Sequence, residues 1–133
     1  MAVKRVTPQE AKGLMDEGYL YVDVRSIPEF ERGHPEGAWN VPLLHMGPAG
    51  MAPNPDFVAV MQKHFGKDAK LIIGCKMGGR SAQASQLLEQ AGYQNLVDQK
   101  GGFEGQPGNP GWLPAGLPVA TAAAAGRTYE SLK

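Results

Sequence analysis

The chain contains a single cysteine, no excess of either charge and no long apolar run. One cysteine in 133 residues excludes an internal disulfide, which is typical of a reducing compartment. Thirteen basic residues balance thirteen acidic ones, so the composition predicts neither a nucleic-acid surface nor an anionic-membrane surface. No stretch reaches the length of a membrane span, and the basic pair Lys4-Arg5 lacks the apolar run of a signal peptide. We therefore expect a soluble, cytoplasmic protein.

Metal-ligand spacing is also missing. The chain has three histidines, His34, His45 and His64, and none forms a zinc-type pattern with another histidine or with the cysteine. We expect no metal and no other cofactor. His34 is predicted to stabilise a turn, and the other two to be surface or partly buried residues, so the sequence does not support a Cys-His dyad.

Strand and helix patterns alternate along the chain, which predicts an α/β fold with a mostly parallel sheet and helices on both faces. Size allows one domain, placed at residues 1–120, with a low-complexity tail at 121–133 that is frayed or weakly helical. The interval 45–53 has two glycines and two prolines and is expected to be a structureless loop. Four helices are expected: one that begins at the capping box 7–10, one over 26–32, one that begins at 54, and one that follows the cysteine and ends at 92. Strands are expected over 19–24, 38–42, 71–74 and 95–98.

The cysteine, Cys75, follows a short apolar strand and precedes a glycine-rich loop that turns into a helix. In an open α/β sheet, ligands bind at this edge. Loop amides and the helix N-terminus form an anion cradle there, and such a cradle stabilises the reactive thiolate. The alternative is an inert, buried cysteine, because cysteine is among the most often buried residue types.

Two cations strengthen the functional interpretation. Lys76 and Arg80 lie at the positive end of the coming helix, where basic side chains are unfavourable by roughly 0.3–1 kcal/mol each. Both would favour a negative charge in the loop, either the thiolate or an incoming anion. Gly78 and Gly79 fit a cradle that needs positive φ or close backbone approach.

The order of motifs resembles the rhodanese family. Its first signature is similar to Asp23-Val24-Arg25, Glu29-Phe30, Gly33-His34, Gly37-Ala38 and Asn40-Val41-Pro42. Cys75 to Ser81 resembles its active-site loop, and Gly101-Gly102-Phe103 resembles the pattern after its last core strand. The similarity is greatest to single-domain thiosulfate sulfurtransferases. It implies a five-stranded sheet and a Cys75 that cycles between thiol and persulfide, with a small anionic sulfur donor and cyanide, a thiol or a thioredoxin-like protein as acceptor.

Within this resemblance, the substrate-binding residues would be Lys76, Met77, Gly78, Gly79, Arg80 and Ser81. Backbone amides of the loop would stabilise the thiolate and the persulfide. Lys76 would attract the dianionic donor, and Arg80 would either hold the loop or bind the sulfonate. Asp23 and Arg25 would support the loop, chiefly as a structural ion pair.

Three questions stay open at this level. Met46 and Met51 fit either a pocket entrance or ordinary packing, and Trp112 fits either a cap on the site or an anchor for the Pro/Gly-rich segment. A cysteine-loop phosphatase or arsenate reductase shares the chemistry, but its loop resembles Cys-x5-Arg, whereas four residues separate Cys75 from Arg80. A non-catalytic binding module on the same fold is the third alternative.

Overall fold

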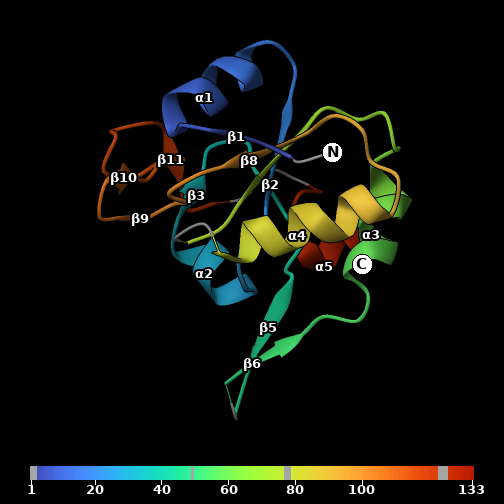
Figure 1. Cartoon of the computed structure of the whole chain (residues 1–133). Coiled ribbons are helices and arrows are strands. Elements are labelled where there is room, and N and C mark those ends of the chain that lie inside the picture. The colour runs from blue at the N-terminus through green and yellow to red at the C-terminus, as the bar shows by residue number, and fades with distance from the viewer. Residues whose placement is uncertain (1–2, 49, 77–78, 123–125) are drawn as a thin grey trace.

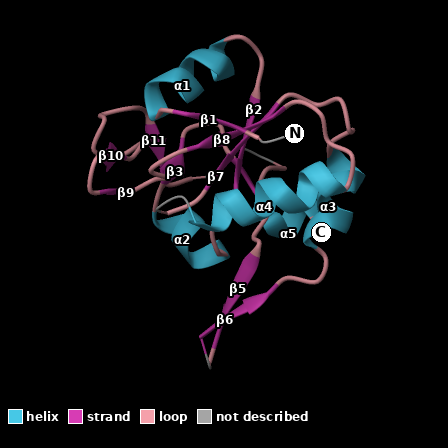
Figure 2. Ribbon diagram, in the orientation of Figure 1, coloured by secondary structure: helices cyan, strands magenta, loops and turns pink. Residues whose placement is uncertain are grey.

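The centre of the molecule is a five-stranded sheet in which every neighbouring pair is parallel (Figure 1). The computed structural model describes residues 3–48, 50–76, 79–122 and 126–133. The strand order is β1-β8-β7-β2-β4, and Figure 2 shows helices around the sheet. The strands are β1 (Lys4–Val6), β2 (Leu20–Asp23), β4 (Trp39–Asn40), β7 (Leu71–Gly74) and β8 (Leu96–Gln99). The predicted α/β class with a five-stranded, mostly parallel sheet is confirmed.

Strand β7 lies at the centre because its sequence suits burial on both faces. All four of its residues are buried, as expected for an apolar run in a parallel sheet covered on both sides. Register with β2 pairs Leu20 with Leu71 and Asp23 with Gly74. The carboxyl ends of β2 and β7 are therefore level, and the residues that follow each strand emerge beside one another.

Helices cover both faces of the sheet (Figure 2). Two apolar clusters lie on opposite faces: one contains Tyr21 and Ile72 with residues of α1, and the other contains Val22 and Ile73 with residues of α3, α4 and α5. This division follows from the alternation of side chains along a strand. The helices are α1 (Pro8–Asp16), α2 (Ile27–Arg32), α3 (Phe57–His64), α4 (Gly79–Gln90) and α5 (Tyr129–Leu132).

The start of α1 confirms the predicted capping box. The Thr7 hydroxyl accepts the Glu10 amide at 3.1 Å, and the Glu10 carboxylate accepts the Thr7 amide at 2.9 Å. The helix then ends before Gly18, whose φ of 109° ends regular helix geometry.

The interval 45–53 is a hairpin and not the structureless loop that was expected. Strands β5 (Leu44–Gly47) and β6 (Gly50–Pro53) pair antiparallel, and the hairpin projects from the body of the molecule (Figure 1). The glycines border its turn, and Pro53 ends the second strand, so both residue types are compatible with a two-stranded ribbon. Met46 and Met51 face each other across it and are 50% and 41% exposed.

The remaining short strands also lie outside the main sheet. β3 (His34–Pro35) pairs antiparallel with β11 (Val119–Ala120), and β9 (Gly105–Gln106) with β10 (Asn109–Pro110). The β3–β11 pair ties the segment after α2 to the segment that precedes the C-terminal residues.

Of the two states expected for the C-terminal tail, frayed or weakly helical, residues 129–132 adopt the helical one and are packed against the domain. Tyr129 and Leu132 of α5 are buried in the same apolar cluster as α3 and α4. The side-chain amide of Asn54 donates to the Tyr129 hydroxyl at 3.2 Å, and the main-chain amide of Asn40 donates to the Arg127 carbonyl at 3.0 Å. Two apolar side chains at i and i+3 thus suffice to hold a one-turn helix that has little helical signal of its own.

Candidate active site

Cys75 follows β7 directly, at the carboxyl edge of the sheet. The side chain is 2% exposed and packs in the apolar cluster that contains Val24, Val41 and Leu43. Helix α4 begins four residues later, at Gly79. The predicted cradle residues Met77 and Gly78 lie outside the described residues. The strand, the loop and the helix therefore occur in the predicted order, and the thiol lies in a tightly packed surrounding.

A turn formed by residues 100–104 holds the main chain of Cys75 through hydrogen bonds. The Phe103 amide donates to the Cys75 carbonyl at 2.7 Å, and the Glu104 amide donates to the Lys76 carbonyl at 2.9 Å. Gly102 has a φ of +62°, and a Cβ atom there would lie 2.6 Å from the Cys75 carbonyl oxygen. This close approach explains the second glycine of Gly101-Gly102-Phe103.

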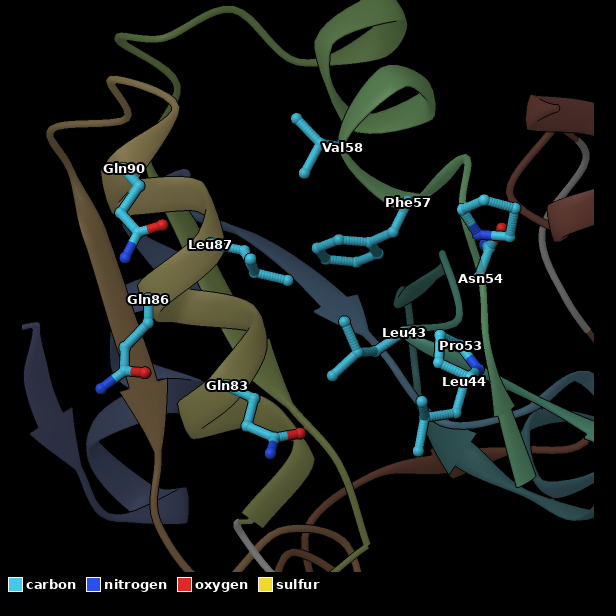
Figure 3. Close-up of a pocket in the computed structure, with 11 residues that line it drawn as sticks. Leu43, Leu44, Pro53, Asn54, Phe57, Val58, Gln83, Gln86, Leu87 and Gln90 are labelled. Carbon is cyan, nitrogen blue, oxygen red and sulfur yellow. The ribbon is translucent and has the colours of Figure 1, made fainter. Parts of the chain in front are cut away.

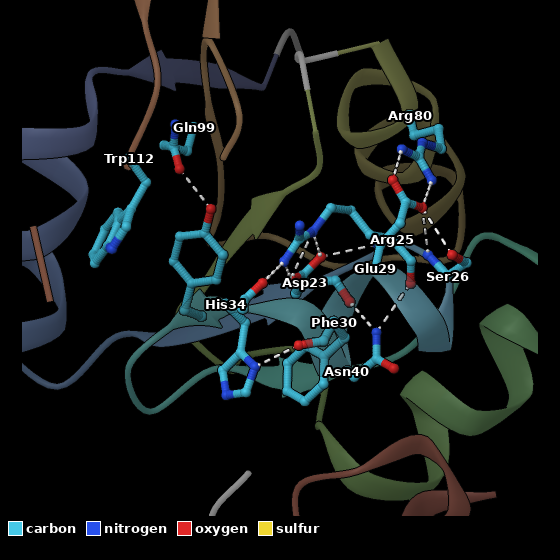
Figure 4. Close-up of polar contacts among 12 residues, drawn as sticks. Asp23, Arg25, Ser26, Glu29, Phe30, His34, Asn40, Arg80, Gln99 and Trp112 are labelled. Carbon is cyan, nitrogen blue, oxygen red and sulfur yellow. Dashed lines mark hydrogen bonds and ion pairs between the residues drawn. The ribbon is translucent and has the colours of Figure 1, made fainter. Parts of the chain in front are cut away.

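Arg80, in the first turn of α4, is bound by Glu29 of α2. Its Nη1 and Nη2 atoms lie 2.7 Å and 2.9 Å from the two carboxylate oxygens of Glu29 (Figure 4). Glu29 also accepts the amide and the hydroxyl of Ser26, at 3.1 Å and 2.8 Å. The Glu29 carboxylate thus offsets the unfavourable cation at the start of α4 and connects this end of the helix to α2.

The electrostatics of this pair follow its geometry. Burial raises the pKa of Glu29, but hydrogen bonds from Arg80 and Ser26 outweigh it and lower that pKa to about 2. The hydrogen bond to Glu29 is likewise the main cause of the raised pKa of Arg80. Both groups therefore carry their charges over the whole range in which the protein would work.

Asp23 and Arg25 form a buried ion pair beside the loop. Arg25 Nη2 lies 2.7 Å from Asp23 Oδ2, and both side chains are less than 5% exposed. Arg25 also donates to the Gly33 carbonyl at 2.6 Å, and its guanidinium lies 4.4 Å from the centre of the Phe103 ring. The side-chain amide of Asn40 donates to the main-chain carbonyls of Asp23 and Arg25 (Figure 4). The pair thus joins the end of β2 to the residues after α2 and to the turn that holds Cys75.

The polar rim of the site carries charges of both signs. Lys76 and Glu104 are half-exposed, with Nζ 3.8 Å from Oε2. They line a hollow of about 100 Å³ together with Arg25, Glu29, Arg32, Gly33 and Phe103, and the buried Cys75 is not among its lining residues. Ser81, also predicted to belong to the cradle, is buried, and its hydrogen bond with Asp98 opposes the rise in the Asp98 pKa that burial causes. Ser81 thereby connects α4 to β8.

Comparison with known proteins follows the same architecture. The family model of the rhodanese-like domain matches residues 7–106. The chain belongs to this family. It is 41% identical to thiosulfate sulfurtransferase 16 of Arabidopsis thaliana over 82% of this chain and 86% of the relative. Thiosulfate sulfurtransferase GlpE of Haemophilus influenzae is 30% identical over 92% of this chain and 99% of the relative.

Other relatives of this rhodanese-like chain are longer or more distant. Senescence-associated protein DIN1 of Raphanus sativus is 42% identical over 70% of this chain, which spans about half (51%) of that protein. Rv0390 of M. tuberculosis has the same fold, with a TM-score of 0.78 at 24% identity, and covers 92% of this chain and 100% of its own. The two relatives named thiosulfate sulfurtransferase show that the family of this chain includes sulfurtransferases, and Rv0390 supports the fold.

The three histidines make contacts with residues outside the segment from Cys75 to Ser81. His34 is buried, its Nδ1 lies 2.7 Å from the Phe30 carbonyl oxygen, and its ring stacks on Phe30 at 3.7 Å (Figure 4). His64 Nε2 lies 2.6 Å from the Leu132 carbonyl oxygen, and the His45 ring lies 5.5 Å from that of Tyr129. The predicted turn role of His34 agrees with this geometry.

Neither metal chemistry nor a membrane span is indicated by the part of the chain that the structure describes. Over residues 3–48, 50–76, 79–122 and 126–133, no group of three or more His, Cys, Asp or Glu side chains is arranged to hold a metal ion. Over the same ranges, no helix is long and apolar enough to cross a membrane.

An apolar groove lies between α3, α4 and the base of the hairpin (Figure 3). Its volume is about 490 Å³, and its walls include Leu43, Phe57, Gln83 and Leu87. Leu87 of α4 lines this groove and is 41% exposed. Met46 and Met51 are not among the groove's lining residues.

Two residues important for the site were missed as site residues from sequence. Glu29 was noted only within the family signature, and its partner Arg80 is 51 positions away. Gly102 was noted only as part of a motif. The available signals were the Ser26-x-x-Glu29 capping pattern and an arginine at a helix N-terminus without a local acid.

Proposed function

We propose that this protein is a sulfurtransferase that moves a sulfane sulfur through a persulfide on Cys75. The Cys75 thiolate attacks the outer sulfur of thiosulfate, the S–S bond of the donor breaks, and sulfite leaves with the bonding electron pair. An acceptor nucleophile then attacks the outer sulfur of the persulfide, which returns Cys75 as thiolate. Cyanide would give thiocyanate, and a thiol or a thioredoxin-like protein would give a new persulfide.

The observation that carries this proposal is the position of the chain's one cysteine. Cys75 follows the central strand of a parallel sheet, where the loop leads into α4 and cationic side chains line the rim. Relatives named thiosulfate sulfurtransferase support the same reaction class. Thiosulfate as the donor and Cys75 as the sulfur carrier are our inferences from this placement.

The decisive experiment is an intact-mass spectrum after thiosulfate treatment, followed by cyanide. We expect a mass increase of one sulfur atom that maps to Cys75 and disappears, with formation of thiocyanate, when cyanide is added. A protein that gains no sulfur and forms no thiocyanate would contradict the proposal.

A phosphatase or arsenate reductase is the second candidate, because one relative is named Protein HIGH ARSENIC CONTENT 1 and is 34% identical over 86% of this chain. That chemistry needs an arginine directed at an oxyanion, whereas both terminal nitrogens of Arg80 bind Glu29. Assays with an aryl phosphate and with arsenate separate the two functions. Release of phosphate or arsenite without thiocyanate would reverse the ranking.

Lys76 and Glu104 should set the affinity for the donor in opposite directions. We expect Lys76→Ala to raise the KM for thiosulfate by about threefold at low ionic strength, because a cation at the rim is lost, and Glu104→Gln to lower it. Both effects should shrink in high salt while kcat changes little. Steady-state kinetics at two salt concentrations measure this.

Lys12→Ala is the matched control. Lys12 is a cation on α1 that pairs with Asp16 at 2.6 Å, so its loss gives the same change in net charge away from the rim. An equal rise in KM for this variant would show that net charge, and not the position of Lys76, matters.

The Glu29–Arg80 pair should make stability depend on pH in acid. The pKa of Glu29 is lowered from 4.5 to about 2, so its stabilising effect is complete above 4.5 and is lost as the pH falls towards 2. We expect the unfolding free energies of the wild type and Glu29→Gln to differ most above pH 5 and to converge near pH 2. Urea unfolding at several pH values measures the difference. Glu31→Gln, an exposed position on the same helix, should show no such convergence.

A further inference from the structure

The side chain of Tyr21 lies beneath the last residue of β7, next to the active-site cysteine. Tyr21 is 1% exposed, and a Cβ atom on Gly74 would overlap its hydroxyl group. Glycine at position 74 therefore leaves the room that the tyrosine occupies. The Tyr21 hydroxyl donates to Gln99 Oε1 at 2.5 Å, between the side chains of β2 and β8.

Gln99 connects Tyr21 to the turn that holds the main chain of Cys75. Its Nε2 atom donates to the carbonyls of Lys100 and Gly102, each at 2.9 Å. The Trp112 amide donates to the same Gly102 carbonyl at 2.9 Å, and the Trp112 ring packs edge-on against Tyr21 with centroids 5.5 Å apart. Figure 4 shows Gln99 and Trp112 together on one side of the Asp23–Arg25 pair. Trp112 is fully buried, so it anchors this segment and does not form an exposed cap.

We propose that Tyr21 and Gln99 act as one positioning unit for the active-site cysteine. Their hydrogen bond fixes the side-chain amide of Gln99, and this amide fixes the Gly102 carbonyl. The main-chain amides of the next two residues of the turn donate to the carbonyls of Cys75 and Lys76 at 2.7 Å and 2.9 Å. The functional part of this proposal rests on sulfur transfer through Cys75. The physical link from Tyr21 to the Cys75 main chain does not depend on it.

The protonation state of Tyr21 supports a fixed direction of the hydrogen bond. Burial, followed by the nearby charges of Asp23 and Cys75, raises the pKa of Tyr21 well above its usual range. The hydroxyl therefore stays a donor, and the Gln99 side chain keeps its oxygen towards Tyr21 and its nitrogen towards Gly102. Each group in the chain then has one defined role.

Tyr21→Phe tests the unit by removing one oxygen atom, and Tyr93→Phe is its matched control. Tyr93 is equally buried, and its hydroxyl donates to the Phe65 carbonyl at 2.6 Å, a contact without residues of the turn. Both variants lose a buried hydrogen bond, so we expect similar losses in melting temperature. Only Tyr21→Phe should lower kcat, by at least about threefold, with an unchanged KM for thiosulfate. Equal kcat losses in the two variants would mean that Tyr21 contributes only to the stability of the fold, and would overturn the proposal.

Amide hydrogen exchange gives a readout that does not depend on turnover. We expect the Phe103 and Glu104 amides to exchange about tenfold faster in Tyr21→Phe and at the wild-type rate in Tyr93→Phe. Unchanged exchange at both amides in Tyr21→Phe would overturn the proposal. If the wild type transfers no sulfur, the proposed function fails. The positioning role is then still decided by two measurements, amide hydrogen exchange and the rate at which iodoacetamide alkylates Cys75.

A double-mutant cycle tests whether the two residues act together. Gln99→Met keeps side-chain length and removes both hydrogen-bonding groups. We expect Tyr21→Phe/Gln99→Met to lose no more kcat than Gln99→Met alone, because the effect of the tyrosine passes through the glutamine. Additive losses would mean that Tyr21 acts by another route and would contradict the unit.

Discussion

Cys75→Ala is expected to abolish sulfur transfer, with kcat reduced by at least about a thousandfold, because the persulfide has no other attachment point in a chain with one cysteine. The fold should remain, since the change removes one buried atom from an apolar cluster and costs about 1 kcal/mol. Thiocyanate formation from thiosulfate and cyanide, with circular dichroism of the same samples, measures both quantities.

Val60→Ala separates the chemistry from the packing. Val60 is buried in the same cluster, and its truncation removes two carbon atoms without changing the thiol. It should cost at least as much stability as Cys75→Ala and leave turnover near the wild-type level when measured well below the melting temperature. Removal of a catalytic nucleophile usually lowers kcat by several orders of magnitude. Sulfur transfer by Cys75→Ala above a few per cent of the wild-type rate would therefore refute the mechanism.

Gly102→Ala should have the second-largest effect, on stability and on turnover together. The added Cβ would lie 2.5 Å from the Lys76 carbonyl carbon and 2.6 Å from the Cys75 carbonyl oxygen, and both are backbone atoms that have little room to move. Together with a φ of +62°, this should lower the unfolding free energy by about 2–4 kcal/mol. The turn would be displaced from the loop, so kcat should fall as well. Urea unfolding and steady-state kinetics provide the measurements.

Gly116→Ala isolates the steric part of this effect. Gly116 has a similar φ of +77°, and nothing lies within 4 Å of the position of its Cβ. It should lose only about 1–2 kcal/mol, the usual penalty for alanine in the left-handed region, with little change in kcat. If both variants lose the same stability and activity, the close approach to Cys75 has no importance of its own.

The central part of the fold was predictable because its signals are local. The four apolar residues of β7, the glycine-rich loop after Cys75 and the helix that ends near Gly92 are read from consecutive residues. The capping box of α1 is a four-residue pattern, and the structure shows both of its hydrogen bonds. The number of strands followed from the family resemblance, and their parallel pairing followed from the alternation of strand and helix patterns.

The parts that sequence did not predict depend on contacts between distant residues. Glu29 of α2 and Arg80 of α4 are 51 positions apart and meet only in the folded chain, and the sequence signals at each residue do not identify the other as its partner. The hairpin of β5 and β6 contains the glycines and prolines of a loop and becomes a ribbon by pairing Leu44 with Pro53. Helix α5 forms because Tyr129 and Leu132 find an apolar surface that only the folded domain offers.

The hydrogen bond from Phe103 to the Cys75 carbonyl also sets the orientation of a peptide plane. In a trans peptide unit the C=O and N–H bonds point in opposite directions, so a carbonyl directed at the turn leaves the Lys76 N–H directed away from it. The first dipole after the cysteine is therefore aimed by a residue 28 positions further along the chain, and substitutions at Phe103 or its neighbours should tilt it while every atom of the thiol side chain stays in place.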